Sequence, residues 1–202
     1  MTPFQRVSGT AAPMTTPNID TDVIMPKMFL RGVDRSGLGE GAFHLLRFSA
    51  GEPNPDFILN REGYRNASFL IVGPNFGCGS SREHAVWGLQ QLGIRALIGT
   101  TFAGIFNDNC ANNGLLTIGL DDATVAEIAA IVADPARNHV TVDLEAQTVR
   151  LVDTDRLIPF AIEPARREAL LLGRDSISAT LAIADEIRAF EAGHRSANPW
   201  MF

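Results

Sequence analysis

The sequence is poor in lysine, in cysteine and in long apolar runs, and each shortage excludes a class of protein. Lys27 is the only lysine among 202 residues, and the net charge of −6 comes without a basic cluster or stripe. Nucleic-acid binding therefore has no support. The two cysteines, Cys78 and Cys110, form neither a disulfide framework nor a CxxC metal pair. A structural zinc or an iron–sulfur cluster held by this chain alone would need more ligands.

No segment has the length or composition of a membrane span or of a secretion signal. The sequence has no run of about 18 apolar residues, and residues 1–14 contain no apolar core of a signal peptide. Hydrophobic residues make up 46% and charged residues 20%, as in ordinary globular proteins. We expect one cytoplasmic domain over residues 1–202 that contacts no membrane.

The middle of the chain predicts parallel β-structure. The apolar run over 67–72 is typical of a buried strand, a helical pattern follows it, and an apolar strand over 94–99 comes next. Two strands bridged by one helix form a βαβ unit with parallel strands. A short helix over 101–106, a turn-rich segment over 107–114 and a strand over 115–118 are expected after it.

The C-terminal half predicts antiparallel additions and helices. Alternating residues over 140–152 indicate a hairpin with one buried face. Helices are expected over about 121–133, 164–172 and 178–192, so that 164–202 forms a C-terminal helical segment, after a strand over 157–162. The fold class is therefore α/β, with a mixed sheet, a βαβ unit, an antiparallel hairpin and flanking helices.

A glycine-rich segment over 31–41 precedes these elements. Its four glycines and four charges predict a flexible surface loop. An ordinary solvated connection and a lid over a substrate site explain this composition equally well.

The segment Gly77-Cys78-Gly79-Ser80-Ser81-Arg82-Glu83-His84 is the strongest candidate for a site. Ser80 and Glu83 have the spacing of a capping box, which would need no further function. A capping box does not need two glycines, nor Arg82, whose positive charge opposes the helix dipole in the first turn. Glycines, hydroxyls, an arginine and free N–H groups at a helix start instead favour a site for a small anion, such as a carboxylate held by two bonds from Arg82.

Other kinds of site fit this sequence less well. The order G-C-G-S-S does not match the G-x-S-x-G turn of serine hydrolases, and His84 lies poorly for a base acting on Ser80. Cys78 near a helix start is a candidate thiolate, although a small buried residue explains it better, as it does Cys110. Asn18, Asp20 and Asp22 have the spacing of a calcium loop, but the glycine and glutamate that such a loop requires are missing.

The residues resemble a known family. GCGSSREHA, together with the N-x-D-T-D-x-I-x-P-x-x-F-L pattern over 18–30, is similar to the small subunit of 3-isopropylmalate dehydratase, the swivel-domain partner in the aconitase superfamily. The likeness continues in order through blocks at 53–60, 102–106, 113–116 and 142–147, and so covers nearly the whole chain. It implies a swivelling β/β/α-type domain like the C-terminal domain of aconitase.

The resemblance also implies roles for individual residues. Ser80 matches the catalytic base that removes a proton next to a carboxylate. Arg82, Ser81 and Gly79 match the part of the site that binds the substrate carboxylate. The supporting positions are Asp22, Glu83 and His84, and the loop Arg31 to Gly41, with Arg31, Asp34 and Arg35 as candidates, would tune substrate choice.

The resemblance finally implies a partner and a reaction. A large subunit would hold a [4Fe-4S] cluster, and this chain would bind no cofactor and no metal. The pair would interconvert 2-isopropylmalate and 3-isopropylmalate through 2-isopropylmaleate in leucine biosynthesis. Related hydro-lyases act on citramalate and methylmaleate, homoaconitate or dimethylmalate, and these remain alternatives, as does a non-catalytic carboxylate-binding module.

Overall fold

A mixed sheet forms the centre of the molecule. The structure is a computed structural model that describes residues 1–30, 35–152, 154 and 156–201. Within these ranges the sheet has seven strands, in the spatial order β6 (Leu116–Gly119), β5 (Ala96–Gly99), β4 (Ala67–Val72), β1 (Arg6–Met14), β7 (His139–Asp143), β8 (Thr148–Leu151) and β9 (Leu157–Pro159). Strands β1, β4, β5 and β6 are parallel, and β7, β8 and β9 extend the sheet in antiparallel fashion.

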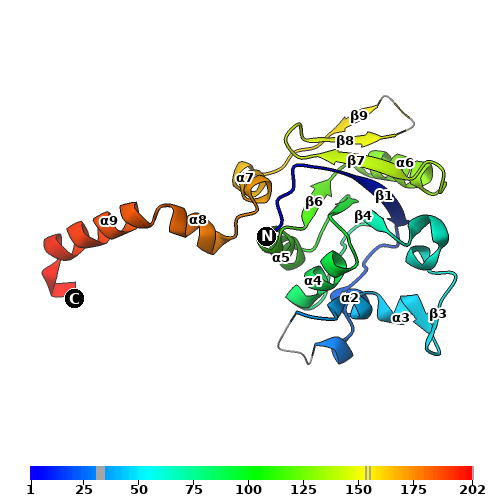
Figure 1. The fold of residues 1–202 in the computed structure, drawn as a ribbon, viewed down its shortest axis with the longest axis horizontal. Coiled ribbons are helices and arrows are strands. Elements are labelled where there is room, and N and C mark those ends of the chain that lie inside the picture. The colour runs from blue at the N-terminus through cyan, green and yellow to red at the C-terminus, as the bar shows by residue number, and fades with distance from the viewer. Residues whose placement is uncertain (31–34, 153, 155, 202) are drawn as a thin grey trace.

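Helices surround this sheet, and two of them stand apart from it (Figure 1). The α-helices are α1 (Thr21–Ile24), α2 (Leu38–Gly41), α3 (His44–Arg47), α4 (Glu83–Gln91), α5 (Gly104–Asn113), α6 (Asp122–Val132), α7 (Pro164–Leu172), α8 (Ser176–Ala182) and α9 (Ala184–Ala197). Short 3₁₀ turns are η1 (Lys27–Phe29), η2 (Ile58–Asn60), η3 (Glu62–Tyr64) and η4 (Pro199–Met201), and a small hairpin pairs β2 (Phe48–Ser49) with β3 (Glu52–Pro53).

Strand β4 separates two apolar layers. Successive side chains of a strand point to opposite faces of the sheet. Leu70 and Val72 therefore pack in the layer that contains α4 and α5, whereas Phe69 and Ile71 pack in the layer that contains α6. All four side chains are fully buried, as expected for a central parallel strand.

The α/β prediction is confirmed in its main parts. Strands β4 and β5 are parallel and joined through α4, which is the predicted βαβ unit. Strands β7 and β8 form the predicted antiparallel hairpin, with Val142 opposite Val149. Helix α7 begins at Pro164 and ends before Gly173, whose φ of 64° is the left-handed conformation that closes many helices.

The prediction of a turn-rich segment over 107–114 is wrong. These residues continue helix α5, which ends only at Gly114, with a φ of 80°. Asparagine is a weak helix former, but Asn107 and Asn113 have partners outside the helix. Asn107 accepts a hydrogen bond from the hydroxyl of Thr117 at 2.6 Å, and Asn113 binds residues of α4. Tertiary hydrogen bonds therefore override the local preference.

Two further elements differ from the sequence prediction. The segment Leu38–Gly41, expected to belong to a loop over 31–41, forms helix α2 because Leu38 is buried in the core. Residues 31–34 lie outside the described residues. The single helix expected over 178–192 is two helices, α8 and α9, with a break at Ile183, whose ψ of 22° departs from helical geometry.

The buried thiol of Cys110 should make stability depend on alkaline pH. Burial raises the pKa of this thiol well above its usual value of 9.0. Above about pH 9 the unfolded chain loses this proton while the folded chain keeps it, so the free energy of unfolding falls as pH rises. We expect urea unfolding of Cys110→Ala to show a shallower fall between about pH 9 and pH 10 than the wild type. Equal slopes would contradict this role of burial.

Candidate active site

The candidate site lies where the parallel strands end. Strands β1 and β4 run side by side, and the chain leaves both at the same edge of the sheet, through residues 15–20 and 73–82. In open α/β sheets this carboxyl edge is where ligands bind. The two segments continue to pair beyond the strands through the hydrogen bonds Asn18 N to Pro74 O (2.9 Å), Gly77 N to Ile19 O (2.7 Å) and Thr21 N to Cys78 O (2.8 Å).

Gly77 is required by both its backbone conformation and its surroundings. Its φ is 78°, which side chains rarely tolerate, and a Cβ at this position would lie 2.2 Å from Cγ of Phe106. Gly79 also has a positive φ, 93°, but its Cβ would meet Asp20 only at 3.4 Å. The first glycine therefore lets the loop pass over α5, and the second sets the turn that precedes the serines.

Ser80 and Ser81 are exposed, and a hydrogen bond from Thr21 fixes the backbone that carries them. The hydroxyl of Thr21, itself buried, donates to the carbonyl oxygen of Ser80 at 2.8 Å. The side chains of Ser80 and Ser81 face solvent. The serine hydroxyls are thus available to a ligand while the peptide that carries them is fixed.

Arg82 is oriented by α1. Its side chain is only 9% exposed, and its Nη1 donates to the carboxylate of Asp22 and, at 3.3 Å, to the carbonyl of Met25. Asp20 caps α1 by accepting from the amide of Val23 at 2.7 Å, which fixes the turn that carries Asp22. The guanidinium of Arg82 therefore lies at the predicted site, and Asp22 and Met25 already accept hydrogen bonds from its Nη1.

The capping box that the spacing of Ser80 and Glu83 allows does not form. Helix α4 begins at Glu83, with Arg82 as an extended N-cap residue that makes no side-chain cap, so Ser80 lies outside the helix. The carboxylate of Glu83 accepts from the side-chain amide of Asn113 at 2.7 Å instead of returning to the helix start. The contacts of Thr21 with Ser80 and of Asp22 with Arg82 keep this loop extended, so α4 begins only at Glu83.

Asn113 connects the site helix to α5. Besides binding Glu83, its side chain accepts from the indole N–H of Trp87 at 2.8 Å, and its carbonyl accepts from Gln90 at 2.6 Å. Asn113 falls in a block of the family resemblance, yet no role was predicted for it, because its neighbourhood was expected to be a turn.

The candidates for substrate choice are only partly described. Arg31 and Asp34 lie outside the described residues. The guanidinium of Arg35 lies 4.1 Å from the ring centroid of Trp87, a cation–π contact, and its carbonyl accepts from the side chain of Gln91. Gln91 also accepts from the amide of Gly39 at 2.9 Å. Helix α4 therefore contacts the segment 35–39 at both of its ends.

The remaining candidates have structural partners. The ring of His84 packs on Trp87, with centroids 4.8 Å apart, and Cys78 is partly exposed, with its sulfur 3.5 Å from the carbonyl of Asn18. The calcium-loop spacing forms no site. Asp20 caps α1, Asp22 pairs with Arg82, and the side chain of Asn18 accepts from Asn75.

Neither a metal cluster nor a membrane span occurs among the described residues. No three histidine, cysteine or acidic side chains gather in a way that would hold a metal ion within the described ranges. No described helix combines the length and the apolarity that crossing a membrane requires.

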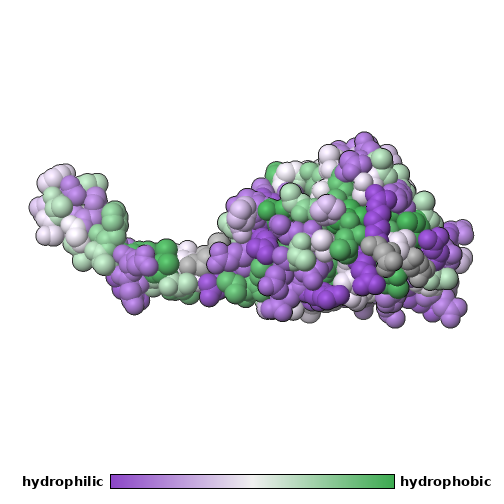
Figure 2. All heavy atoms as spheres, turned by 90° about the horizontal axis from the view of Figure 1, so that it is seen from above, coloured by the Kyte–Doolittle hydropathy of each residue, from purple (hydrophilic) through white to green (hydrophobic). Residues whose placement is uncertain are grey.

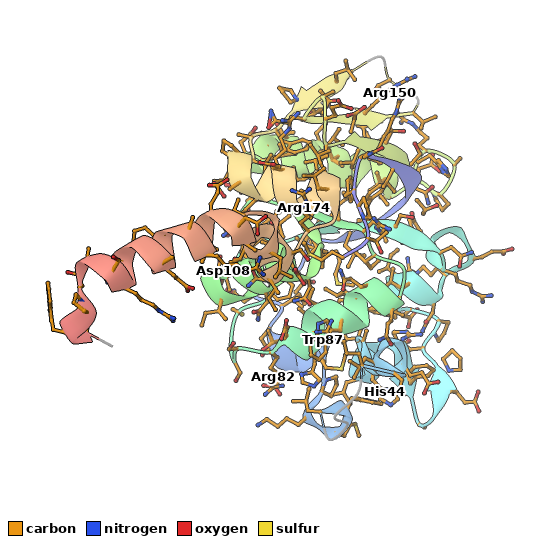
Figure 3. The ribbon with its side chains drawn as sticks, turned by 60° about the vertical axis from the view of Figure 1, so that its left-hand side comes forward. His44, Arg82, Trp87, Asp108, Arg150 and Arg174 are labelled. Atoms are coloured by element: carbon orange, nitrogen blue, oxygen red, sulfur yellow. The ribbon has the colours of Figure 1, made fainter. Side chains whose placement is uncertain are left out.

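In Figure 3, Arg82 and Trp87 lie in the lower part of the view and Arg150 of β8 lies at its top, so Arg150 is remote from the candidate site. The structure defines the class of α/β proteins in which a glycine- and serine-rich loop follows the parallel strands of a mixed sheet at their carboxyl edge. Residues 1–123 match the family described as aconitase C-terminal domain, and residues 176–202 match that described as the C-terminal domain of the 3-isopropylmalate dehydratase small subunit.

Relatives of known name narrow the class further. The chain is 54% identical over 202 residues to the 3-isopropylmalate dehydratase small subunit 2 of Salmonella choleraesuis, covering 100% of this chain and 96% of the relative. It is also 54% identical to small subunit 1 of Mannheimia succiniciproducens, covering 100% and 99%. The chain belongs to the family of 3-isopropylmalate dehydratase small subunits, which are hydro-lyase subunits.

A solved structure agrees with the fold. The crystal structure of 3-isopropylmalate dehydratase from Methanocaldococcus jannaschii superposes with a TM-score of 0.66 at 23% identity, over 93% of this chain and 99% of that one. The predicted swivel-type α/β class is thereby confirmed.

Replacing Gly77 should destabilise the protein far more than replacing a glycine with free space. Gly77→Ala would strain a positive φ and overlap Phe106, at a cost of about 3 kcal/mol. Gly104→Ala, at the open start of α5, should change the free energy of unfolding by less than about 0.5 kcal/mol. Urea unfolding of both variants measures the difference, and similar values would show that the loop relaxes around Gly77.

Proposed function

We propose that this chain provides the base and the carboxylate-binding residues for the interconversion of 2-isopropylmalate and 3-isopropylmalate through 2-isopropylmaleate, in leucine biosynthesis. One observation carries the proposal. Ser80 is exposed at the carboxyl edge of the sheet, its carbonyl is fixed by Thr21, and the guanidinium of Arg82 is fixed two residues further on. The full-length identity to named small subunits supports the choice of reaction.

Ser80 acts as the base in this proposal. Its oxygen, as the alkoxide, takes the proton from the carbon next to a substrate carboxylate. The electron pair of the broken C–H bond forms the double bond as hydroxide leaves the neighbouring carbon. Adding water back with the two carbons exchanged gives the isomer and restores the alkoxide. A serine hydroxyl is a weak base, so the N-terminus of α4 and the cation of Arg82 must stabilise its negative charge.

Arg82, Ser81 and Gly79 bind the substrate carboxylate. Asp22 and Met25 occupy Nη1 of Arg82, so the substrate would use the other donors of the guanidinium. The exposed hydroxyl of Ser81 and the backbone at Gly79 lie on the same loop. Asp22 positions the guanidinium and does not touch the substrate, and Glu83 and His84 support the loop through α5 and Trp87.

The reaction needs a second chain. We propose that a large subunit holds a [4Fe-4S] cluster, which would supply Lewis-acid assistance for the departing hydroxide. The cysteines of this chain do not fit a cluster, because Cys110 is fully buried in the core and Cys78 lies elsewhere, beside Asn18. The complex would work in the cytoplasm, on a free alkylmalate.

Ser80→Ala should abolish turnover without loosening the complex. With the family's large subunit and isopropylmalate under anaerobic conditions, we expect kcat to fall by roughly 10³-fold while the affinity between subunits stays at the wild-type value. The ultraviolet absorbance of the unsaturated acid measures turnover. Wild-type kcat would remove Ser80 from the role of base. A wild-type complex that acts on citramalate, homoaconitate or dimethylmalate instead would change the substrate, and activity on none would leave a carboxylate-binding module.

Arg82→Lys should weaken both binding and catalysis. Lysine keeps the charge but cannot bind Asp22 and a substrate carboxylate with one planar group. We expect a rise in KM and a fall in kcat, of roughly tenfold each. Arg150→Lys, on the exposed side of β8 at the other end of the molecule, is the matched control and should leave both constants unchanged. Wild-type kinetics of Arg82→Lys would contradict the carboxylate clamp.

A further inference from the structure

The last helices form an arm that leaves the body of the protein. We call residues 176–201, which contain α8, α9 and η4, the C-terminal arm. Figure 1 shows it extending beyond α7, and Figure 2 shows hydrophobic side chains on its surface. Its large apolar residues are exposed, with Phe190 at 72% and Trp200 at 76%. The others are Ile177, Leu181, Ile183 and Met201.

The arm is amphipathic. Ile183, Ile187 and Phe190 follow one another at the spacing of a single helix face. The opposite face of α9 carries Asp185 and Arg188, which form an ion pair at 2.8 Å. No described residue of α9 is buried. Helices of 7 and 14 residues are too short to be stable alone in water, so the apolar face requires a partner.

We propose that the apolar face of the C-terminal arm docks on the cluster-bearing large subunit and holds the two chains together. This inference rests on the proposed function for the identity of the partner. Residues 1–123 of the body match a domain named for its position at the C-terminus of aconitase, whereas the arm matches a family named for the 3-isopropylmalate dehydratase small subunit. A domain within a longer chain is held near its active site by the tether. A separate subunit lacks that tether and must obtain its affinity from additional contacts.

The arm begins beside the elements that carry the site. Asp175 caps α8 by accepting from the amide of Ser178 at 2.7 Å. Asp175, Arg35 and Glu83 line one cavity of about 550 Å³. Glu83 is the first residue of α4 and follows Arg82 directly, so a partner that covers the site can continue along this cavity to the arm.

The size of the apolar face suits this role. A stable complex buries about 800 Å² on each partner, and each aromatic side chain can supply about 150–250 Å². The loop around Ser80 alone is too small to supply this contact area. A large share of it can come from the arm, through Phe190, Trp200 and the four other exposed apolar residues.

Charge substitutions on the full chain test the proposal. The double variant Leu181→Asp with Phe190→Asp should raise the Kd for the family's purified large subunit at least tenfold. Ala192→Asp introduces one negative charge on the opposite face of α9, against two in the double variant, and should change the Kd less than twofold. At saturating large subunit, kcat should equal the wild-type value for both, because neither touches the site. Hydrogen exchange should show protection of residues 176–201 only in the complex.

Other results would overturn either this inference or the proposed function on which it rests. An unchanged Kd for the double variant would do so, provided its thermal unfolding shows an intact body. A loss of self-association by sedimentation, without loss of affinity for the large subunit, would assign the face to a second copy of this chain. Arm-dependent binding without turnover of any alkylmalate would reject the proposed function and leave the docking role standing. Full turnover, with an affinity for the large subunit that does not depend on the arm, would support the proposed function and reject the docking role of the arm.

Discussion

The parallel pairing of β1 with β4 is the constraint on which the site depends. Met14 lies opposite Val72, so the two strands end together and send their following loops out of one edge. This pairing lets Arg82 reach Asp22 and lets Thr21 reach Ser80, although about 60 residues separate the partners in sequence. The hydrogen bonds between the loops extend the pairing beyond the sheet. The geometry of the site is thus a continuation of the register of two buried strands.

Asp22 neutralises the positive charge of Arg82 in a partly buried environment. A guanidinium that is 9% exposed would be costly without a counter-ion, and Asp22 supplies one while its own carboxylate stays 46% exposed. The cation is therefore held on one edge by a carboxylate that still contacts water. On the proposed function, the substrate brings a second carboxylate to the remaining donors, and the fixed orientation reduces the ordering that binding requires.

The sequence predicted those parts of the molecule in which local pattern and tertiary structure agree. The apolar run of β4, the glycine at 77 and the amphipathic α4 indicated the βαβ unit and the loop, and the family motifs located Ser80 and Arg82. The capping box suggested by the spacing of Ser80 and Glu83 does not form, because the contact between Thr21 and Ser80 comes from a distant segment. The short helix expected over 101–106 was extended too little, because Asn107 and Asn113 of α5 find partners in β6 and α4, which no local preference reveals. The contact of Arg35 with Trp87 was equally invisible, since it joins two segments through one aromatic face.

On the proposed function and the proposed docking of the arm, the exposure of Ser80 and Ser81 and that of the arm have one explanation. A serine alkoxide surrounded by water would be solvated and protonated, so a base of this kind requires a site from which water is excluded. The body leaves its serines open to solvent at the edge of the sheet, and it leaves the apolar face of the arm open as well. A partner that covered only the arm would leave the base wet, and one that covered only the loop would bind a small polar surface. A single partner that covers both dries the base and gains the apolar area that holds it in place.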